Sequence, residues 1–525
     1  MTSADTPPAE TVVPIMPSRR IGVLLAVTIL FLAGLVPYII YRNIMHQNYY
    51  YAPLDSYPSP EEIASKLHCP GRPNVTAEGY LQKKPPLFKL PLRTKGRYIV
   101  DSSEEKVKLM SVNWYGASDE DFVPGGLDIR HRKEIAATIR EMGFNSVRLP
   151  YSDELVLTNP DVPEKFWSKN QDLVHIKGRE AGNLDSEGLR QQKGHSGQHV
   201  VGGHDKTGGK NNGTATVKAL DIFDAVVQAL TDEGIAVIVN NHITQARWCC
   251  DGNLCDATWA NDYLGKVCRI IQTEEQWMQN WEKVMRPYVD NPLVIGADLR
   301  NENRSPMGKM LWTSWAAAAE KAAARLHALQ PDWLMFVEGV ASSNYLQGVR
   351  SRPITLSIPD RVVYSAHVYG WSGWGSLLKG PYWSRDYASF AYDMYDNWGF
   401  LLEEDIAPVW VGEFGAPDRP NTGDLNYWTN LMNFLKDVDA DWGYWAINPR
   451  KPKDNETESY AIVQDDWVTP KCDYRMYDLM TKLGLKPYNS TDSQAFTNVS
   501  PLKSAPTQAA GSTIRGKGKQ VPLGI

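Results

Sequence analysis

The sequence predicts one α/β domain, a (β/α)₈ barrel of the TIM type, preceded by an N-terminal transmembrane helix. Eight short β-rich runs alternate with longer amphipathic segments, which is the pattern of βα units in a parallel sheet. Eight such units favour a closed barrel over an open sheet. The chain of 525 residues has room for one barrel of about 250 residues or more and for appendages.

The N-terminal transmembrane helix is predicted at residues 21–41, which carry no charged side chain and can span about 30 Å of hydrocarbon. We interpret them as an uncleaved signal anchor. The alternative is a cleaved signal peptide, which would have a shorter apolar run followed by small residues, whereas Pro-Tyr-Ile-Ile-Tyr ends this one. Arg19 and Arg20 before the span and Arg42 after it favour a cytoplasmic N-terminus only slightly.

Sequons for N-glycosylation support the same orientation, because all of them follow the span. They begin at Asn74, Asn212, Asn455, Asn489 and Asn498. We therefore expect a single-pass type II membrane protein, with its main domain extracellular or in the secretory lumen.

The rest of the chain divides by composition. We expect a cytoplasmic tail at 1–20, the anchor at 21–41, a Tyr- and Pro-rich stem at 42–85, the barrel at 86–487 and a disordered tail at 488–525. Inside the barrel, residues 153–216 form a long insertion that is Gly-rich from residue 177 onward.

The elements of the barrel are predicted from these alternating runs. The strands are expected at 108–116, 146–150, 235–242, 294–300, 334–339, 362–370, 409–415 and 443–449. The clearest helical segments are 127–143, 218–234, 312–330 and 425–440.

Composition excludes some partners. A formal charge of -6, from 55 basic and 61 acidic side chains, offers no basic field for a phosphate backbone, so we expect no nucleic acid partner. The 18 Trp and 25 Tyr residues suit stacking on sugar rings as well as core packing. Either role is open for Trp114, Trp248, Trp259, Trp371 and Trp374. We expect a monomer.

The cysteines indicate disulfides. They are Cys69, Cys249, Cys250, Cys255, Cys268 and Cys472. Four of them fall within twenty residues, but without the C-x₂-C pairs of metal sites. An even count and a secretory address favour disulfides, with the pairing left open.

Two of the predicted strands end in glutamate. The fourth runs into Asn301-Glu302, and the seventh ends Gly412-Glu413-Phe414-Gly415. In such barrels the active site forms at the C-terminal strand ends. Cleavage of a glycosidic bond needs two carboxyl groups on opposite faces of the bond. The alternative for each Glu is a structural ion pair.

These two motifs resemble the acid/base and nucleophile motifs of glycoside hydrolase family 5, the cellulase-type enzymes of clan A. The resemblance covers about residues 106 to 450 and extends to other strand ends. It implies that Arg148 braces the nucleophile, His242 contacts substrate, Asn301 contacts the sugar 2-hydroxyl, His367 and Tyr369 form a His-x-Tyr pair, and Trp445 lies under the sugar.

The resemblance implies a retaining, two-step β-glycoside hydrolase without metal or cofactor. Glu413 would attack the anomeric carbon, while Glu302 protonates the leaving oxygen and later deprotonates water. The charge of Glu413 and partial burial would keep Glu302 neutral, and Arg148 would keep Glu413 ionised. Alternatives for two of the residues are a structural pair of Arg148 with Asp298 and a core position for Trp445.

Two departures leave the substrate open between a β-glucan, a mannan and a glycolipid or other glycoconjugate. Asn303-Arg304 replaces the Pro that most members have after the acid/base, and Asn240 replaces a common Asp. The motifs Arg300 to Arg304 and Trp-Cys-Cys are similar to a plant and fungal branch with unsettled substrates. Competing functions are a catalytically silent carbohydrate-binding barrel and a glycosyltransferase using Asp437 and Asp439.

Overall fold

The computed structural model describes residues 52–66, 83–175, 216–250, 252–304, 312–373, 380–451 and 456–487. Several predictions lie outside these residues, namely the tail at 1–20, the anchor at 21–41, most of the stem and of the Gly-rich insertion, the tail at 488–525, Cys69, Trp374 and the five sequons. Across the described ranges, no helix is both long and apolar enough to cross a membrane.

Eight parallel strands close into a barrel, which confirms the predicted (β/α)₈ barrel. They are β4 (Met110–Asn113), β5 (Ser146–Ser152), β8 (Ala236–Ile243), β9 (Val294–Asp298), β10 (Leu334–Glu338), β11 (Val362–His367), β12 (Val409–Phe414) and β13 (Asp441–Tyr444). The order around the barrel follows the chain, and β13 closes it on β4 by pairing Trp442 with Met110.

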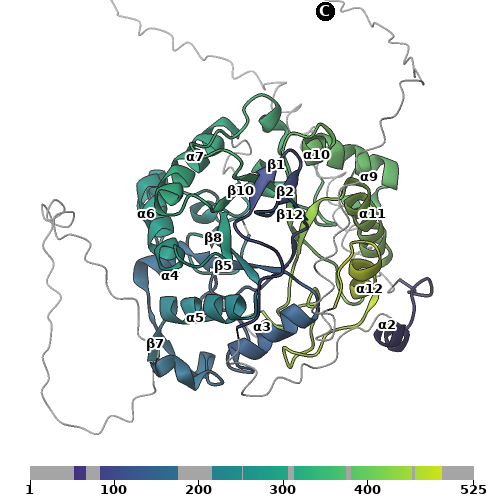
Figure 1. Cartoon of the computed structure of the whole chain (residues 1–525), viewed down its shortest axis with the longest axis horizontal. Helices are drawn as coiled ribbons and strands as arrows, with labels where there is room; N and C mark the ends of the chain where they lie inside the picture. Colours follow the sequence, from purple (N-terminus) through teal and green to yellow (C-terminus); the bar gives the residue numbers. More distant parts are fainter. Residues whose placement is uncertain are drawn as a thin grey trace, which may run out of the picture.

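Helices surround the strands in a ring (Figure 1). The α-helices are α2 (Pro60–Lys66), α3 (Arg132–Glu141), α4 (Asp153–Thr158), α5 (Ala219–Asp232), α6 (Glu274–Met285), α7 (Trp312–Leu329), α8 (Val340–Ser343), α9 (Tyr387–Met394), α10 (Phe400–Glu403), α11 (Thr422–Val438) and α12 (Tyr474–Thr481). Short 3₁₀ helices are η2 (Glu164–Phe166), η3 (Gln171–His175), η4 (Leu254–Asp256), η5 (Asp262–Val267), η6 (Arg286–Tyr288), η7 (Gln347–Arg350) and η8 (Tyr382–Ser384), and η9 (Tyr395–Gly399) is a π-helical turn.

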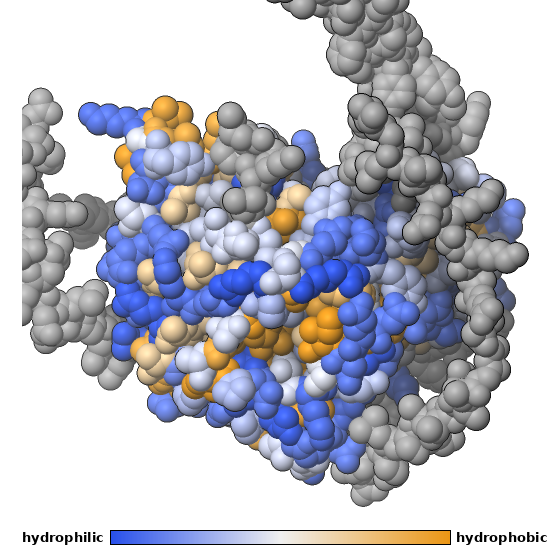
Figure 2. All heavy atoms as spheres, turned by 90° about the horizontal axis from the view of Figure 1, so that it is seen from above, coloured by the Kyte–Doolittle hydropathy of each residue, from blue (hydrophilic) through white to orange (hydrophobic). Residues whose placement is uncertain are grey.

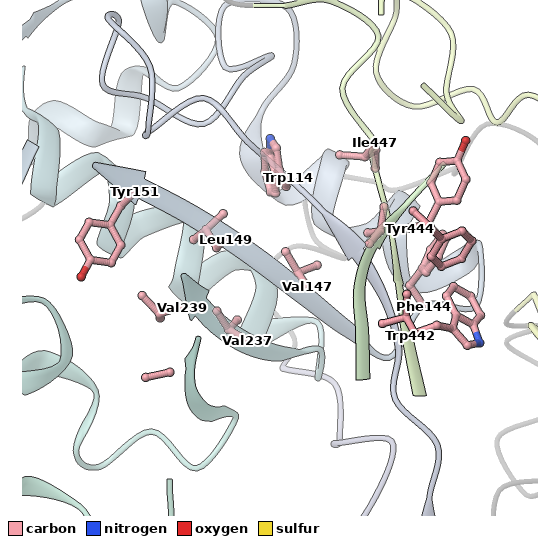
Figure 3. Close-up of a cluster of buried hydrophobic side chains, with 14 of the residues drawn as sticks. Trp114, Phe144, Val147, Leu149, Tyr151, Val237, Val239, Trp442, Tyr444 and Ile447 are labelled. Atoms are coloured by element: carbon pink, nitrogen blue, oxygen red, sulfur yellow. The ribbon is translucent and has the colours of Figure 1, made fainter. Parts of the chain in front are cut away.

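Alternation along the strands decides which side chains enter the barrel. Val147, Leu149 and Tyr151 of β5 belong to the core between strands and helices, beside Val237 and Val239 of β8 (Figure 3). Side chains of a strand point to opposite faces in turn. Arg148 therefore points into the barrel interior.

A small antiparallel sheet closes the bottom of the barrel. It consists of β1 (Arg93–Lys95), β2 (Tyr98–Val100) and β3 (Lys106–Val107) and lies over the centre of the ring in Figure 1. Ile99 and Val107 share a buried apolar cluster with Phe336 and Trp410 from the barrel strands. This closure leaves the C-terminal ends of the strands as the end where a site can form.

Local sequence explains several helix boundaries. Asn421 caps α11, where its side chain accepts from the N–H of Asp424 and the Asp424 side chain accepts from Asn421 in return. Thr273 caps α6 in the same position by accepting from Gln276 N–H. In Figure 2 the described surface is mostly hydrophilic, with apolar side chains in small groups, as the outward faces of amphipathic helices require.

Many predicted boundaries differ from the structure, and three differences bear on how the domain is organised. The last strand begins at Asp441 and ends at Tyr444, so Trp445 lies in the loop that follows it. The two described ends of the insertion after β5 pair with each other in a separate two-stranded sheet of β6 (Asp161–Pro163) and β7 (Thr216–Lys218). Residues 52–66 of the expected stem pack on the barrel domain, because the Tyr57 hydroxyl donates to Asp478 across 2.9 Å.

The alternative glycosyltransferase motif lies at the wrong end of the barrel. Asp439 ends α11 and pairs with Lys106 and Lys108 near the closing sheet, and Asp437 accepts from the Tyr387 hydroxyl. Both carboxylates thus pair with other side chains of the protein. They lie just before β13 begins, at the end of the barrel opposite the C-terminal strand ends. The structure gives no support to a metal-dependent transferase site there.

Candidate active site

Arg148 is the centre of a buried polar network at the C-terminal strand ends. A guanidinium has five N–H groups in a fixed plane, and here each has a partner. They donate to Asp298 across 2.7 Å, Asn113 across 3.1 Å, Asn301 across 2.8 Å, Glu338 across 3.0 Å and Glu413. Burial alone would lower the pKa of Arg148, but the carboxylates of Asp298, Glu413 and Glu338 outweigh it and raise the pKa. Arg148 thus pairs with both Asp298 and Glu413, the two alternatives left open by the sequence.

Glu413 ends β12 and has a donor on each carboxylate oxygen. Arg148 donates to Oε1, and the Tyr369 hydroxyl donates to Oε2 across 2.9 Å. His367 Nδ1 lies 3.8 Å from Oε2. Burial and the charge of Glu413 raise the pKa of Tyr369 well above its ordinary value, so Tyr369 keeps its proton for this bond. The two donors thus hold the Glu413 carboxylate from both of its oxygens.

Glu302 follows β9, and its surroundings favour the protonated form of its carboxyl group. Burial raises the pKa of Glu302 to about 7, against the opposing charges of Arg304 and Arg148. The expected cause was the charge of Glu413 together with partial burial, but desolvation dominates because Glu302 is only 6% exposed. Its Oε1 lies 3.1 Å from Nδ1 of His367.

Both histidines of the site are neutral near pH 7. Burial lowers the pKa of His367 to about 4, despite the opposing charge of Glu413. Burial and Arg148 lower the pKa of His242 well below its ordinary value, and its Nδ1 lies 2.9 Å from the Asn240 side-chain oxygen. Neutral rings can act as hydrogen-bonding groups without adding positive charge beside Glu302.

Trp445 belongs to a small cluster of aromatic side chains. It stacks on Tyr115 with ring centroids 4.8 Å apart and planes 3° apart, and on His242 at 5.6 Å and 12°. The edge of Trp248 meets it at 6.4 Å. Trp445 is 8% exposed, so it packs against these rings and still presents a small area at the site.

Asn301 lies against a disulfide between adjacent residues. Its Nδ2 is 3.4 Å from the sulfur atoms of both Cys249 and Cys250, which are bonded to each other. The guanidinium of Arg304 is 3.8 Å from Cys249 Sγ. Cys255 and Cys268 form a second disulfide, with 13 residues of separation, and Cys472 is also disulfide-bonded. The four clustered cysteines are thus joined as two disulfides rather than as a metal cluster.

The other tryptophans divide between core and site. Trp114 and Trp259 pack in the core, Trp114 with no exposed area and Trp259 against Trp315. Trp371 is 48% exposed and stacks on Tyr369 at 5.1 Å, directly beside the polar network. Trp248 and Trp371 therefore flank the site.

Several residues of the site were not predicted. Glu338 ends β10 and bonds to both Arg148 and the Glu302 backbone. Asn113 of β4 donates to Gly412 O across 3.0 Å and accepts from Arg148. The sequence signal for Glu338 was present, because it ends an apolar run as Glu413 does.

One set of possible metal ligands occurs among the described residues, formed by Glu302, His367 and Glu413. Their ligand atoms lie within 4.8 Å of one another. Each is already hydrogen-bonded to another group of the site, and the buried guanidinium of Arg148 adjoins Glu413. A nearby positive charge disfavours a bound cation. The donor set therefore suits acid and nucleophile chemistry better than metal binding.

A protein-family comparison then identifies the domain, because residues 197–451 match the model described as cellulase (glycosyl hydrolase family 5). The chain thus resembles the family 5 glycosyl hydrolases over these residues. It is a β-glycoside hydrolase, a glycosidase that hydrolyses O-glycosyl compounds.

Several relatives are similar to this chain over most of its length. An endoglucanase of Paenibacillus polymyxa is 27% identical over 426 residues, which cover 77% of this chain and 89% of the relative. A glycosyl hydrolase 5 family protein of Chamaecyparis obtusa is 27% identical over 402 residues, covering 73% of this chain and 64% of that protein. The major extracellular endoglucanase of Xanthomonas campestris is 26% identical over 398 residues, covering 72% and 68%.

Solved structures share the family 5 fold. The catalytic domain of the Xanthomonas campestris endoglucanase superposes with a TM-score of 0.56 at 23% identity, covering 75% of this chain and 100% of that domain. A cellotetraose complex of the Pyrococcus horikoshii endocellulase gives a TM-score of 0.55 at 22% identity, covering 76% and 99%. At this identity the likeness concerns the fold.

Proposed function

We propose that this family 5 enzyme retains anomeric configuration, with Glu413 as nucleophile and Glu302 as acid/base. The observation that carries the proposal is the separation of the two carboxyl groups, since one oxygen of each lies within 4.8 Å of the other. Retaining enzymes place their carboxyl groups about 5–5.5 Å apart, whereas inverting enzymes need roughly 6.5–9.5 Å to admit water. The short separation favours direct attack by Glu413.

In the first step, Glu413 attacks the anomeric carbon while Glu302 gives its proton to the departing glycosidic oxygen. The bond to the leaving sugar breaks as the bond to Glu413 forms. Arg148 and Tyr369 orient the Glu413 carboxylate and support its charge. With a pKa raised to about 7 by burial, Glu302 still carries its proton in mildly acidic solution.

In the second step, the glycosyl-enzyme is hydrolysed. Glu302, now ionised, takes a proton from water, the water oxygen bonds to the anomeric carbon, and Glu413 leaves as a carboxylate. Trp445 would lie under the sugar, Asn301 would contact its 2-hydroxyl, and His242 and His367 would contact substrate or Glu302. The contacts of these side chains with Arg148, Tyr115 and one another support the assignment.

For the substrate we propose a β-linked glucan, with a mannan or a glycoconjugate as the other candidates. Two of the three named relatives are endoglucanases, which supports a glucan. Exposed Trp371 beside the site would suit a further sugar unit. A screen of soluble β-glucan, mannan and glycolipid substrates tests this, and hydrolysis of mannan or glycolipid alone would contradict the glucan assignment.

A mechanism-based 2-deoxy-2-fluoro-glycoside tests the nucleophile. It should accumulate as a covalent adduct on Glu413, located by peptide mass spectrometry, and Glu413→Gln should abolish both adduct and turnover. Azide tests the acid/base, because Glu302→Ala should recover activity with azide and give a β-azide product. An α-azide product would contradict retention, and full activity of Glu413→Gln would refute the assigned nucleophile.

We also propose that residues 21–41 anchor the enzyme as a type II membrane protein, with the barrel outside the cell or in the secretory lumen. The uncharged apolar run supports this. Full-length protein should stay in the membrane fraction after carbonate extraction. Release into the supernatant would count against an anchor.

A further inference from the structure

Glu338 is a fully buried carboxyl group at the end of β10, and the mechanism above does not use it. Its Oε1 accepts from Arg148 across 3.0 Å. Its Oε2 accepts from the backbone N–H of Glu302 across 2.7 Å and from the hydroxyl of Ser343. Three donors thus satisfy this buried carboxyl group. A buried polar atom without a hydrogen-bond partner would destabilise the fold, so the three contacts belong to one defined arrangement.

Glu338 is linked to Glu302 directly, by the hydrogen bond from the Glu302 backbone. His367 lies beside both side chains: its Nδ1 is 3.1 Å from Glu302 Oε1, whereas its Nε2 is 3.7 Å from Glu338 Oε1, too far for a hydrogen bond. The backbone hydrogen bond is therefore the connection from Glu338 to the acid/base.

The backbone of Glu302 needs such support. Its φ is +43°, in the left-handed region that residues with a Cβ seldom adopt. A residue in this region keeps its conformation only when surrounding contacts determine it. The Glu338 bond to the Glu302 N–H supplies one of those contacts at the strained residue itself.

A second strained segment, the short element α8, holds Glu338 from the other side, and its backbone is left-handed rather than α-helical. Ala341, Ser342 and Ser343 have φ values of +55°, +56° and +60° in succession. This turn aims the Ser343 hydroxyl at Glu338, and the Ser342 N–H donates to the carbonyl of Asn303 across 3.2 Å. The turn thus contacts both Glu338 and the residue that follows Glu302.

The charges around Glu338 fit a role through hydrogen bonds. Burial and the charge of Asp298 raise the pKa of Glu338 well above its ordinary value, although Arg148 opposes them. Arg148 already faces the carboxylates of Asp298 and Glu413. These two carboxylates already balance the charge of Arg148, so the contacts of Glu338 matter as hydrogen bonds rather than as an additional negative charge.

We propose that Glu338 is a positioning residue that fixes the backbone of Glu302 and so directs its carboxyl group at the leaving oxygen. The inference rests on the proposed role of Glu302 as acid/base. Loss of Glu338 should impair proton donation more than nucleophilic attack.

The test compares leaving groups. The probes are phenyl and 2,4-dinitrophenyl β-glycosides of whichever of glucose, cellobiose and mannobiose the wild-type enzyme hydrolyses fastest. Dinitrophenolate departs without a proton, whereas phenolate needs one from Glu302. Glu338→Gln keeps the volume but has one acceptor oxygen for two N–H groups. It should lower kcat/KM for the phenyl glycoside about tenfold or more, part of the roughly 10²- to 10⁴-fold from general acid catalysis. The dinitrophenyl glycoside should change much less.

A second variant covers the case in which Glu338→Gln does not fold. Ser343→Ala removes one hydroxyl group and should give the same selectivity with a smaller amplitude. Both variants should also shift the alkaline limb of the pH profile of kcat/KM, because that limb reports the ionisation of Glu302. A change that only loosened the fold would leave the position of this limb unchanged.

The matched control is Asp441→Asn. Asp441 is also buried and accepts a backbone N–H, that of Leu109 across 2.7 Å, but it lies where β13 begins, at the opposite end of the strands. This variant should lower thermal stability without any leaving-group dependence.

Glu302→Ala separates failure of this inference from failure of the proposed function. Equal losses on both probes in Glu302→Ala would overturn its role as acid. Strong leaving-group dependence in Glu302→Ala, with equal losses or no loss in Glu338→Gln and Ser343→Ala, would overturn only the role of Glu338.

Discussion

The hydroxyl of Tyr369 and the carboxylate of Glu413 are joined by a hydrogen bond of 2.9 Å, while the other oxygen of Glu413 is bound by Arg148. The carboxylate is therefore held from two sides before substrate arrives. Preorganised donors of this kind stabilise charge as it develops or departs in a reaction. Glu413 belongs to β12, and Tyr369 follows the end of the neighbouring β11 by two residues, so the barrel strands set their spacing.

Tyr369→Phe should lower kcat by on the order of 10²-fold, because one donor to the reacting carboxylate is lost. KM should change little, since the hydroxyl contacts Glu413 rather than the sugar in this structure. Steady-state kinetics on an aryl β-glycoside measure both. Tyr57→Phe is the matched control, because Tyr57 makes an equally long bond of 2.9 Å to Asp478 outside the barrel, and its kcat should stay at the wild-type level.

Arg148→Met should inactivate the enzyme and destabilise the fold. It leaves the buried carboxyl groups of Asp298, Glu338 and Glu413 without their shared cation. Breaking a buried ion pair in this way costs about 3–5 kcal/mol of unfolding free energy. Urea denaturation gives the value. Lys218→Met, which breaks an exposed pair with Asp161, should cost at most about 1 kcal/mol, and a similar cost for Arg148→Met would contradict the network.

The pH dependence of kcat/KM should show an alkaline limb near pH 7. Burial raises the pKa of Glu302 to about 7, so the carboxyl group is protonated below that pH and loses its proton above it. An acid catalyst is active only while it holds its proton, so activity falls as pH rises through this value. Glu302→Gln cannot ionise and should lack the limb. A wild-type profile that is flat from pH 6 to 9 would be inconsistent with Glu302 as the acid.

The two disulfides should have different effects when removed. The Cys255–Cys268 bond closes a loop with 13 residues of separation, so replacing both with Ser should cost about 3 kcal/mol in the chain-entropy model and lower Tm. Cys249 and Cys250 are adjacent and close no such loop, but both touch Asn301. Their double replacement by Ser should mainly lower kcat/KM. Calorimetry and kinetics on both variants check the division, and the reverse pattern would contradict it.

The barrel was predictable because eight short β-rich runs alternate with longer amphipathic segments along the chain. The strand ends bearing Arg148, His242, Glu302 and Glu413 follow from the rule that barrel sites form at one end. The structure brings all eight predicted site residues to that end, as the contacts of Arg148, Tyr369 and Trp445 show. Their catalytic roles remain proposals.

Other features depend on contacts between distant segments. Glu338 resembles any acidic residue after an apolar run until the left-handed turn at Ser343 and the Glu302 backbone are seen to meet it. The cause of the raised pKa of Glu302 also follows from three-dimensional burial. The joining of Cys249 to its neighbour Cys250, with Asn301 beside them, is likewise set by the fold of the loop after β8.

The small sheet of β1, β2 and β3 has one more consequence. Because Ile99 and Val107 fill the far end of the barrel together with Phe336 and Trp410, that end is sealed by apolar packing. Substrate must then enter, and products leave, at the opposite end of the barrel. The two ends of the barrel can therefore evolve independently. Substitutions at the closed end change thermal stability, whereas changes in the loops at the open end alter which sugars bind.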